Sequence, residues 1–300
     1  MIKNFFDKAP KNAIQGINNE NSSGDYIYNT KNCNDCYSVV NSEDCKFVYD
    51  CGYAKDCYDV NFFGQVRGIQ NCYECHEIGH GVQNIYMSDD IIDGCNNIYY
   101  SKDCTTSNNL FGCIGLGHSQ YCILNKQYSK EEYKSILPKI IQHMKNTGEW
   151  GNFFPIELSP FCYNETTAQN YYPLSKSEVL EKGWKWKDDF IQAKYQGPKY
   201  DIPDSIHDTH DEVLNKILEC EKCKKNFRIV KPELSFYKKM NIAIPQNCPN
   251  CRYNKRVSSS NSRELFLHKC DNCNVDIKTS QNPQNSNEIY CNKCYLNIVK

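Results

Sequence analysis

Four Cys-x-x-Cys pairs in the C-terminal part of the chain constrain its fold more than any other feature. Two cysteines separated by two residues share one tight turn, and two such turns complete a tetrahedral shell of four thiolates for Zn²⁺. The intervals between turns are 224–247 and 274–290, and the second has the usual length for a zinc site. The spacing therefore predicts two zinc ions per chain, with the candidate ligands Cys220, Cys223, Cys248, Cys251, Cys270, Cys273, Cys291 and Cys294.

The spacing alone leaves two ways of combining these pairs. Pairs adjacent in the sequence would give one site within residues 220–251 and a second within residues 270–294. A cross-braced arrangement, as in RING domains, would instead join the pair 220/223 to the pair 270/273.

Cysteine usage also bears on the compartment. The chain has 20 cysteines, and its first residues, MIKNFFDKAPK, lack the apolar segment of a secretory signal. No run approaches the length of an apolar membrane-spanning helix. In a reducing compartment, thiols bind metal or pack as small apolar groups instead of forming disulfides. We therefore expect an intracellular, cytoplasmic protein with no membrane partner.

The net charge of −1 conceals an asymmetry along the chain. Residues 1–218 carry −9 and residues 219–300 carry +8. Because a zinc ion held by four thiolates has a formal charge of −2, the metal-loaded C-terminal segment keeps about +4. A basic module of this kind is typical of nucleic-acid-binding proteins. The candidate contacts to nucleic acid or to an acidic partner are Lys224, Lys225, Arg228, Lys238, Lys239, Arg252, Lys255, Arg256 and Arg263, with Tyr237 or Tyr253 to stack on bases.

Cysteines in the N-terminal half recur at regular intervals of nine positions, or of about twice that number. Cys95, Cys104, Cys113 and Cys122 are nine apart, and Asp or Asn often precedes such a cysteine. This period is too short for the common helical repeats. It predicts a β-solenoid of about 18–20 residues per coil, with about five coils over residues 25–125 and cysteines stacked inside. An irregular cysteine-rich α+β domain is the alternative.

The motif that contains Cys72 and Cys75 has two interpretations. Together with His76 and His80, these cysteines could form a third metal site. Cys75 also falls in register with the repeating cysteines. This register favours the interpretation that Cys75 packs inside the predicted solenoid and is not a metal ligand.

Two histidines before the zinc module raise a similar question. His207 and His210 stand beside Asp204, Asp208 and Asp211. They could form a metal cluster, but a solvated helix start is the favoured interpretation.

The sequence between the predicted solenoid and the predicted zinc module indicates helices. Ser129 and Glu132 form a capping box ahead of apolar residues at helical spacing. A helix here would cover the last coil, which otherwise exposes an open sheet end. The predicted order is a mainly β solenoid with an N-terminal cap (1–125), a capping helix (126–150), an aromatic-rich connector with short helices (151–218), a treble-clef zinc domain (219–260) and a zinc ribbon (261–300).

Residues 218–256 resemble the "probable zinc-binding domain" family of treble-clef type. The family pattern is CxxC, an aromatic strand, an E-x-x-FY helix and P-x-x-C-x-x-C-R. The matching residues are Cys220, Cys223, Phe227, Glu233, Phe236, Tyr237, Pro245, Cys248, Cys251 and Arg252. Because this match ends the first unit at Arg252, it favours consecutive pairing of the cysteines.

The wider chain is similar to zinc-ribbon proteins from uncultured bacterial and viral genomes. The similarity lies in segments 21–33, 110–133 and 159–174. It implies an architecture and metal ligands but no activity.

Two binding functions remain open from the sequence. The basic zinc module favours binding of nucleic acid or a nucleoprotein. The long solenoid favours the alternative, a structural or protein-docking scaffold that contacts an acidic partner or another copy of the chain. An enzyme is disfavoured, because a zinc ion with four cysteine ligands has no open position for substrate.

Overall fold

The computed structural model describes residues 9–64, 67–188, 200–284 and 288–299. The chain divides into two compact units. The first combines Met1–Ser159 with Ser262–Lys300, and the second is Pro160–Asn261. The C-terminal segment thus belongs with the N-terminal part of the chain, although the whole second unit separates them in the sequence.

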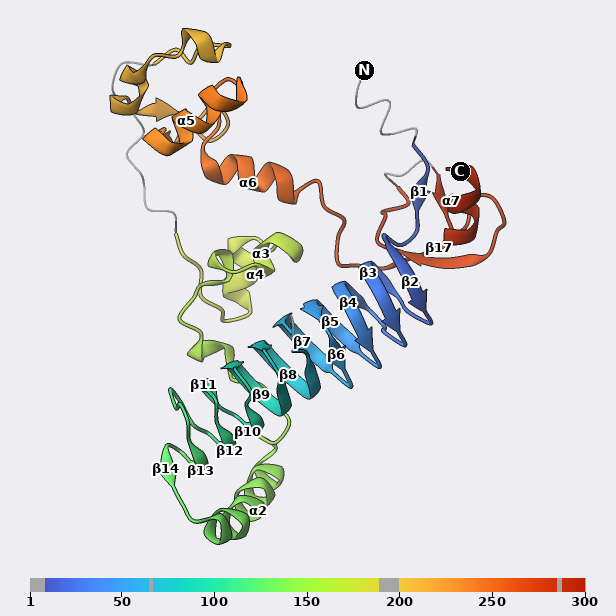
Figure 1. Ribbon diagram of the computed structural model, residues 1–300, viewed down its shortest axis with the longest axis vertical. Coiled ribbons are helices and arrows are strands. Elements are labelled where there is room, and N and C mark those ends of the chain that lie inside the picture. The colour runs from blue at the N-terminus through green and yellow to red at the C-terminus, as the bar shows by residue number, and fades with distance from the viewer. Residues whose placement is uncertain (1–8, 65–66, 189–199, 285–287, 300) are drawn as a thin grey trace. The chain divides into compact units, whose positions relative to one another are not determined.

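Strands β2 to β13 form a parallel β-solenoid in which each coil stacks on the preceding one (Figure 1). Nine successive parallel pairings lead from β2 to β13. This confirms the predicted solenoid and excludes the irregular α+β alternative. The strands are β2 (Gly16–Glu20), β3 (Gly24–Lys31), β4 (Cys36–Glu43), β5 (Lys46–Gly52), β6 (Ala54–Lys55), β7 (Tyr58–Phe63), β8 (Ile69–Gly79), β9 (Val82–Ile92), β10 (Asn96–Tyr99), β11 (Lys102–Thr105), β12 (Asn108–Phe111) and β13 (Gln120–Ile123).

A three-residue unit repeats around each coil. One residue of the unit points into the coil, and the residue before it has a left-handed backbone. The second coil is an example: its inward side chains are all buried, and φ of the preceding residues lies between 51° and 57°. The inward residues are Cys33, Cys36, Val39 and Ser42, and the left-handed residues are Asn32, Asp35, Ser38 and Asn41.

This unit explains why Asp or Asn so often precedes an inward cysteine. A left-handed backbone costs an ordinary L-residue roughly 1–2 kcal/mol, and Asn and Asp tolerate it best among residues with a side chain. Among the described non-glycine residues from Asn18 to Asn125, 18 of the 32 with left-handed φ are Asn or Asp. The repeated bend therefore selects the sequence pattern.

The inward residues stack in rows along the solenoid and form its core. Cysteines and aliphatic side chains share these rows, and the whole set is one cluster of buried residues. Thiols fit because they are small and apolar. One row consists of Cys72, Ile85, Ile98, Leu110 and Cys122.

The predicted coil length is wrong. The register places Tyr37 opposite Tyr49 and Lys46 opposite Tyr58, so that a regular coil advances the chain by twelve positions. Because the coils are shorter than predicted, residues 16–123 hold about nine turns instead of five.

The nine-position interval has a simple origin in the three-residue unit. It spans three units, or three-quarters of a coil. The Cys104 thiol, for example, donates to the carbonyl of Cys113 in the next coil at 3.8 Å. Every spacing between inward residues of regular coils is a multiple of three, so the cysteine intervals did not reveal how many units make a coil.

The C-terminal end of the solenoid is closed by the segment that follows directly. Strand β14 (Lys126–Gln127) pairs antiparallel with β13. Helix α2 (Lys130–Thr147) begins at the predicted capping box of Ser129 and Glu132. Its buried Tyr133 packs in a cluster with Phe111 and Ile123 of the last coils. The predicted helix thus lies against the last coils of the solenoid.

The N-terminal end of the solenoid contacts the C-terminal segment. Strand β1 (Lys11–Asn12) pairs in parallel with β19 (Ile289–Tyr290). The remaining elements of this segment are β17 (Phe266–Lys269), β18 (Asp276–Thr279) and α7 (Asn292–Ile298). Figure 1 shows these red elements beside the blue first strands.

The second unit is built from short elements around its own core. Ile206 and Val213 from the connector pack with Leu218, Phe227 and Leu234 of the predicted treble clef. No helix among the described residues is long and apolar enough to cross a membrane. The elements are α3 (Ala168–Tyr171), α4 (Lys176–Glu181), β15 (Leu218–Glu219), β16 (Asn226–Phe227), α5 (Lys231–Met240), α6 (Pro249–Val257) and the 3₁₀ turns Tyr163–Glu165, Ile206–Asp208 and Asp211–Asn215.

The three-residue unit predicts that a β-branched residue destabilises the fold at the left-handed position but not at the neighbouring exposed position. Asp56 has φ 54°, so Asp56→Val should destabilise the solenoid by about 1–2 kcal/mol, measured by urea denaturation. Tyr58→Val, at an exposed strand position just beyond, should change stability by less than about 0.5 kcal/mol. Equal effects of the two substitutions would contradict the assigned unit.

Candidate metal centres

Four thiol groups converge at one point in the second unit. Cys220, Cys223, Cys248 and Cys251 place their sulfur atoms within 4.8 Å of one another. Cys220 follows strand β15, whereas Cys248 is the N-cap of helix α6 and Cys251 lies in its first turn. The group can hold a metal ion.

Local hydrogen bonds shape the turn that carries the first two of these cysteines. The Lys224 N–H donates to the Cys220 carbonyl and the Cys220 N–H to the Lys225 carbonyl, each at 2.9 Å. Lys224 adopts φ 61°, which reverses the chain after Cys223. Across the site, the Cys248 N–H donates to the Cys220 sulfur at 3.2 Å.

A second group of thiols has the same construction in the first unit. Cys270, Cys273, Cys291 and Cys294 also lie within 4.8 Å of one another. The Cys270 N–H donates to the Val275 carbonyl at 2.9 Å, as in the first turn. The Cys291 N–H donates to the Cys270 sulfur at 3.3 Å.

The second group differs in one respect from a ribbon made of two β-turns. It contains the hairpin of β17 and β18, but its second pair of cysteines begins helix α7. The two metal groups therefore share one plan, in which a cysteine turn faces a helix N-terminus.

The surroundings favour the thiolate of one cysteine in each site, whereas burial and neighbouring thiols raise the pKa of Cys251 to about 12. Burial acts to raise the pKa of the Cys220 thiol, but backbone N–H groups of Cys223 and Cys248 lower it to about 6. The pKa of Cys270 is also lowered to about 6, because the N–H groups of Cys273 and Cys291 outweigh its burial. Since metals bind the thiolate, the lowered pKa of Cys220 and Cys270 assists metal binding at these two ligands.

The structure groups the cysteines in sequence order. Pair 220/223 combines with pair 248/251, and pair 270/273 with pair 291/294. The cross-braced arrangement is not formed.

The cysteines and histidines near residue 75 do not converge on a third site. Cys72 and Cys75 point into the solenoid core, where burial raises the pKa of Cys75 to about 12. His76 faces outward and bonds to Asp89 at 2.9 Å. Within the described ranges, these residues belong to no group of metal ligands. The packing interpretation of the sequence agrees with this placement.

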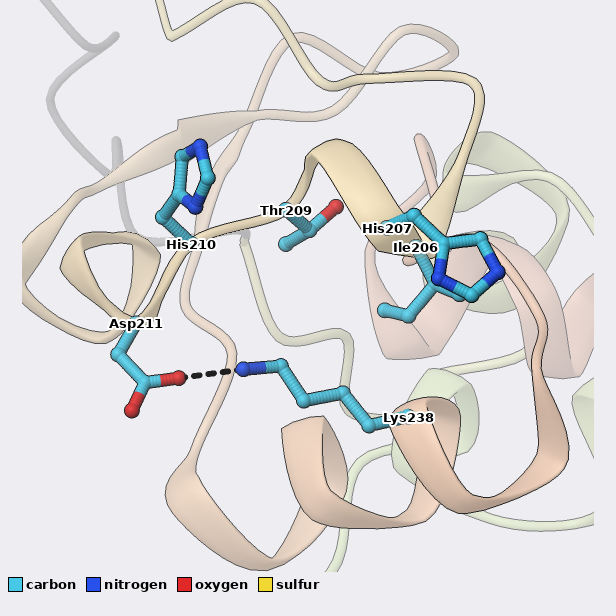
Figure 2. Close-up of a pocket in the computed structure, with 6 residues that line it drawn as sticks. All are labelled: Ile206, His207, Thr209, His210, Asp211 and Lys238. Atoms are coloured by element: carbon cyan, nitrogen blue, oxygen red, sulfur yellow. Dashed lines mark hydrogen bonds and ion pairs between the residues drawn. The ribbon is translucent and has the colours of Figure 1, made fainter.

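His207 and His210 line a shallow pocket of the second unit (Figure 2). The two imidazole rings lie apart in this view, with Thr209 between them. Asp211 is paired with Lys238 at 2.6 Å. Among the residues described, the histidines do not join a metal-ligand group with the nearby aspartates.

Two of the predicted nucleic-acid contacts, Arg252 and Arg263, have partly buried side chains that bind internal partners. Arg252 donates to the Tyr237 hydroxyl at 3.0 Å and to the Glu233 carboxylate at 3.1 Å. Tyr237 itself donates to Glu233 at 2.5 Å. These three residues belong to the family pattern noted in the sequence, and they tie helix α5 to helix α6 next to the metal ligands.

Arg263 is the second of these two partly buried arginines. It forms an ion pair with Asp50 and lies over the Tyr49 ring at 5.1 Å. Its side chain is only 11% exposed. Arg263 thus attaches the C-terminal segment to the solenoid, a contact between residues far apart in the sequence that no local pattern indicates.

The other predicted basic contacts lie in the second unit. Lys224 pairs with Glu219 at 3.4 Å and Lys238 with Asp211, in both cases with exposed lysines. Lys225 is half-buried. The exposed remainder comprises Arg228, Lys239, Lys255 and Arg256.

Comparison with known proteins adds little to this description. No protein-family model matches the chain, and no curated protein matches it. One solved structure with some similarity is the UDP-N-acetylglucosamine O-acyltransferase LpxA from Moraxella catarrhalis, with 12% identity and a TM-score of 0.15. The alignment covers 47% of this chain and 92% of LpxA. At this TM-score the likeness carries no argument about fold or activity.

Metal stoichiometry should separate the ligand cysteines from the packing cysteines. Native mass spectrometry of the full chain should show two bound metal ions. Cys220→Ser/Cys223→Ser should lose one of them, because two of four ligands are removed. Cys72→Ala/Cys75→Ala should retain both. Loss of a metal ion from this second variant would show that residues 72–80 form a site after all.

Arg252 should contribute to the stability of the first metal unit. Arg252→Ala leaves Glu233 and Tyr237 without their cationic partner and should cost about 1–3 kcal/mol. Urea denaturation with a chromophoric chelator would report release of the metal. Arg256→Ala, one turn further along helix α6, is exposed and should cost less than about 0.5 kcal/mol. An effect of Arg256→Ala as large as that of Arg252→Ala would refute this role.

Proposed function

We propose that both cysteine groups bind Zn²⁺ and that the chain acts by binding nucleic acid through its second unit. A Zn–S bond of about 2.3 Å in a tetrahedron places the sulfur atoms about 3.8 Å apart. The Cys223 and Cys248 sulfur atoms are 3.7 Å apart, and those of Cys273 and Cys291 are 3.8 Å apart. These separations support zinc at both sites.

The proposed role of both zinc ions is structural. Four cysteine ligands complete the tetrahedral shell and leave no position for a substrate or for a reactive water. We therefore propose a non-enzymatic protein. The resemblance of residues 218–256 to a treble-clef family supports the same view of the first site.

One observation carries the nucleic-acid proposal: cations and aromatic rings are exposed together on the two helices of the first zinc unit. Lys255 and Arg256 are exposed on helix α6 beside Tyr253, which is 45% exposed. Lys239 is exposed on helix α5 one turn after Phe236, which is 53% exposed.

This combination suits single-stranded nucleic acid. Lys and Arg neutralise phosphates, and exposed aromatic rings stack on unpaired bases with little sequence preference. Tyr253 is the better placed of the two predicted stacking residues, because the Tyr237 ring is buried between helices α5 and α6. Phe236 is an exposed ring that the sequence analysis did not select.

A protein-docking function is the second candidate. Its support is a set of exposed apolar side chains on and around helix α5, namely Val230, Phe236, Met240 and Ile242. Such a set is also typical of a protein contact.

Fluorescence anisotropy of labelled single-stranded RNA and DNA with the zinc-loaded full chain tests the first candidate. Lys255→Glu/Arg256→Glu should weaken binding at least tenfold and reduce the slope of log affinity against log salt by about 2. Lys278→Glu/Lys293→Glu makes the same charge change on the other zinc unit and should leave binding nearly unchanged. Absence of salt-sensitive binding by the unaltered chain would reject nucleic acid and leave the docking function.

A further inference from the structure

The two ends of the solenoid are closed by different means. At the C-terminal end, β14 turns back on β13 through the adjacent residues, with Cys122 opposite Gln127. This closure is local in sequence and requires no metal. At the N-terminal end, the covering strand comes from the second zinc unit, at the opposite end of the sequence.

Backbone hydrogen bonds join this covering strand to the first residues of the solenoid. The Lys11 N–H donates to the Glu288 carbonyl at 3.1 Å, and the Ala13 N–H donates to the Tyr290 carbonyl at 2.9 Å. Strands β1 and β19 form a small parallel sheet of their own, beside the solenoid sheet that begins at β2. Without β19, these donors would form an unpaired strand edge.

A buried carboxylate strengthens the same contact. Asp25 is 1% exposed and accepts from the backbone N–H groups of Gln15, at 2.7 Å, and Tyr26, at 3.0 Å. Its other oxygen accepts from the hydroxyl of Ser280, at the end of β18 in the zinc unit. Asn12 donates to Asn292 at 3.2 Å. The zinc unit therefore forms hydrogen bonds with polar side chains at the N-terminal end of the solenoid.

Residues next to the metal ligands in the sequence hold the covering strand in place. Asp271, next to the ligand Cys270, accepts from the Ile289 N–H at 2.6 Å and donates its own N–H to the Ile289 carbonyl at 3.1 Å. The strand then ends at the ligand Cys291. Because metal binding supplies much of the folding free energy of such small units, loss of the metal would release β19.

We infer that the second zinc unit is a metal-dependent cap, and that the coil end it covers binds a second copy of this chain when the metal is lost. The released edge offers Lys11 and Ala13 as backbone donors, together with the buried Asp25. The same edge of another copy carries the same groups and can pair with it.

The asymmetry of the two ends determines the size of the assembly. Since β14 and helix α2 still close the C-terminal end, only one edge per chain is released. Two equal edges that meet give a closed dimer with twofold symmetry, whereas two free ends would give an open fibre. The inference therefore specifies a dimer.

Analytical ultracentrifugation of full-length variants tests this inference. Cys270→Ser/Cys273→Ser should convert the monomer to a concentration-dependent dimer. The matched control, Cys220→Ser/Cys223→Ser, should lose one metal ion and stay monomeric. Hydrogen exchange at a concentration where monomer predominates should be about tenfold faster or more for residues 11–20 of the first variant, with β8 to β13 still protected.

Three outcomes would overturn the inference. The first variant could stay monomeric, with unchanged exchange at residues 11–20. It could form fibres or larger polymers, which require a second free edge. It could lose protection throughout the solenoid, which would make the zinc unit part of the fold instead of a cover on a completed surface. The nucleic-acid proposal is independent, because it rests on the other zinc unit and is read by anisotropy.

Discussion

The structure of the solenoid depends on one backbone constraint, a left-handed residue in every three-residue unit. This bend turns the chain at each side of a coil and brings four side chains per coil into a narrow interior. Only small or branched side chains fit there, so Cys, Val, Ile and Ser occupy the inward rows. The same bend requires residues that tolerate positive φ, and Asn and Asp therefore dominate the position before each inward residue. Thiol packing and the abundance of Asn have a common geometric cause.

The two cysteine groups that can hold a metal ion lie in separate units of the chain. The treble-clef unit within Pro160–Asn261 forms its own core with the connector, and Arg252 links its helices beside the ligands. The C-terminal unit has the same cysteine plan, but it contacts the N-terminal end of the solenoid through β19 and Ser280, and strand β5 through Arg263. Two similar sites therefore have different structural surroundings. The first presents exposed cations and aromatic rings, whereas the second closes a strand edge.

Several features could be predicted because their signals are local. The spacing of the four C-terminal Cys-x-x-Cys pairs indicated two groups of metal ligands, and the Ser129–Glu132 capping box marks the start of helix α2. The recurring cysteines indicated a solenoid, but the predicted coil length was wrong. Every interval between inward residues of regular coils is a multiple of three, whatever the number of three-residue units in a coil. Arg252 and Arg263 were predicted as contacts to nucleic acid or an acidic partner from their charge alone. Their carboxylate partners, Glu233 and Asp50, lie on other elements and could not be identified from spacing.

The sequence by itself determined the elements whose chemistry is local: the two sets of four cysteines, the capped helix and the preference for a tightly bent β-repeat. The tertiary structure alone decided how many units make a coil, which cations bind within the protein and where the C-terminal segment packs. These outcomes depend on backbone pairing and on contacts between distant residues, such as β1 with β19 and Asp25 with Ser280. Backbone N–H and C=O groups are the same in every residue, so their pairing between the two ends of the sequence leaves no pattern in the order of side chains.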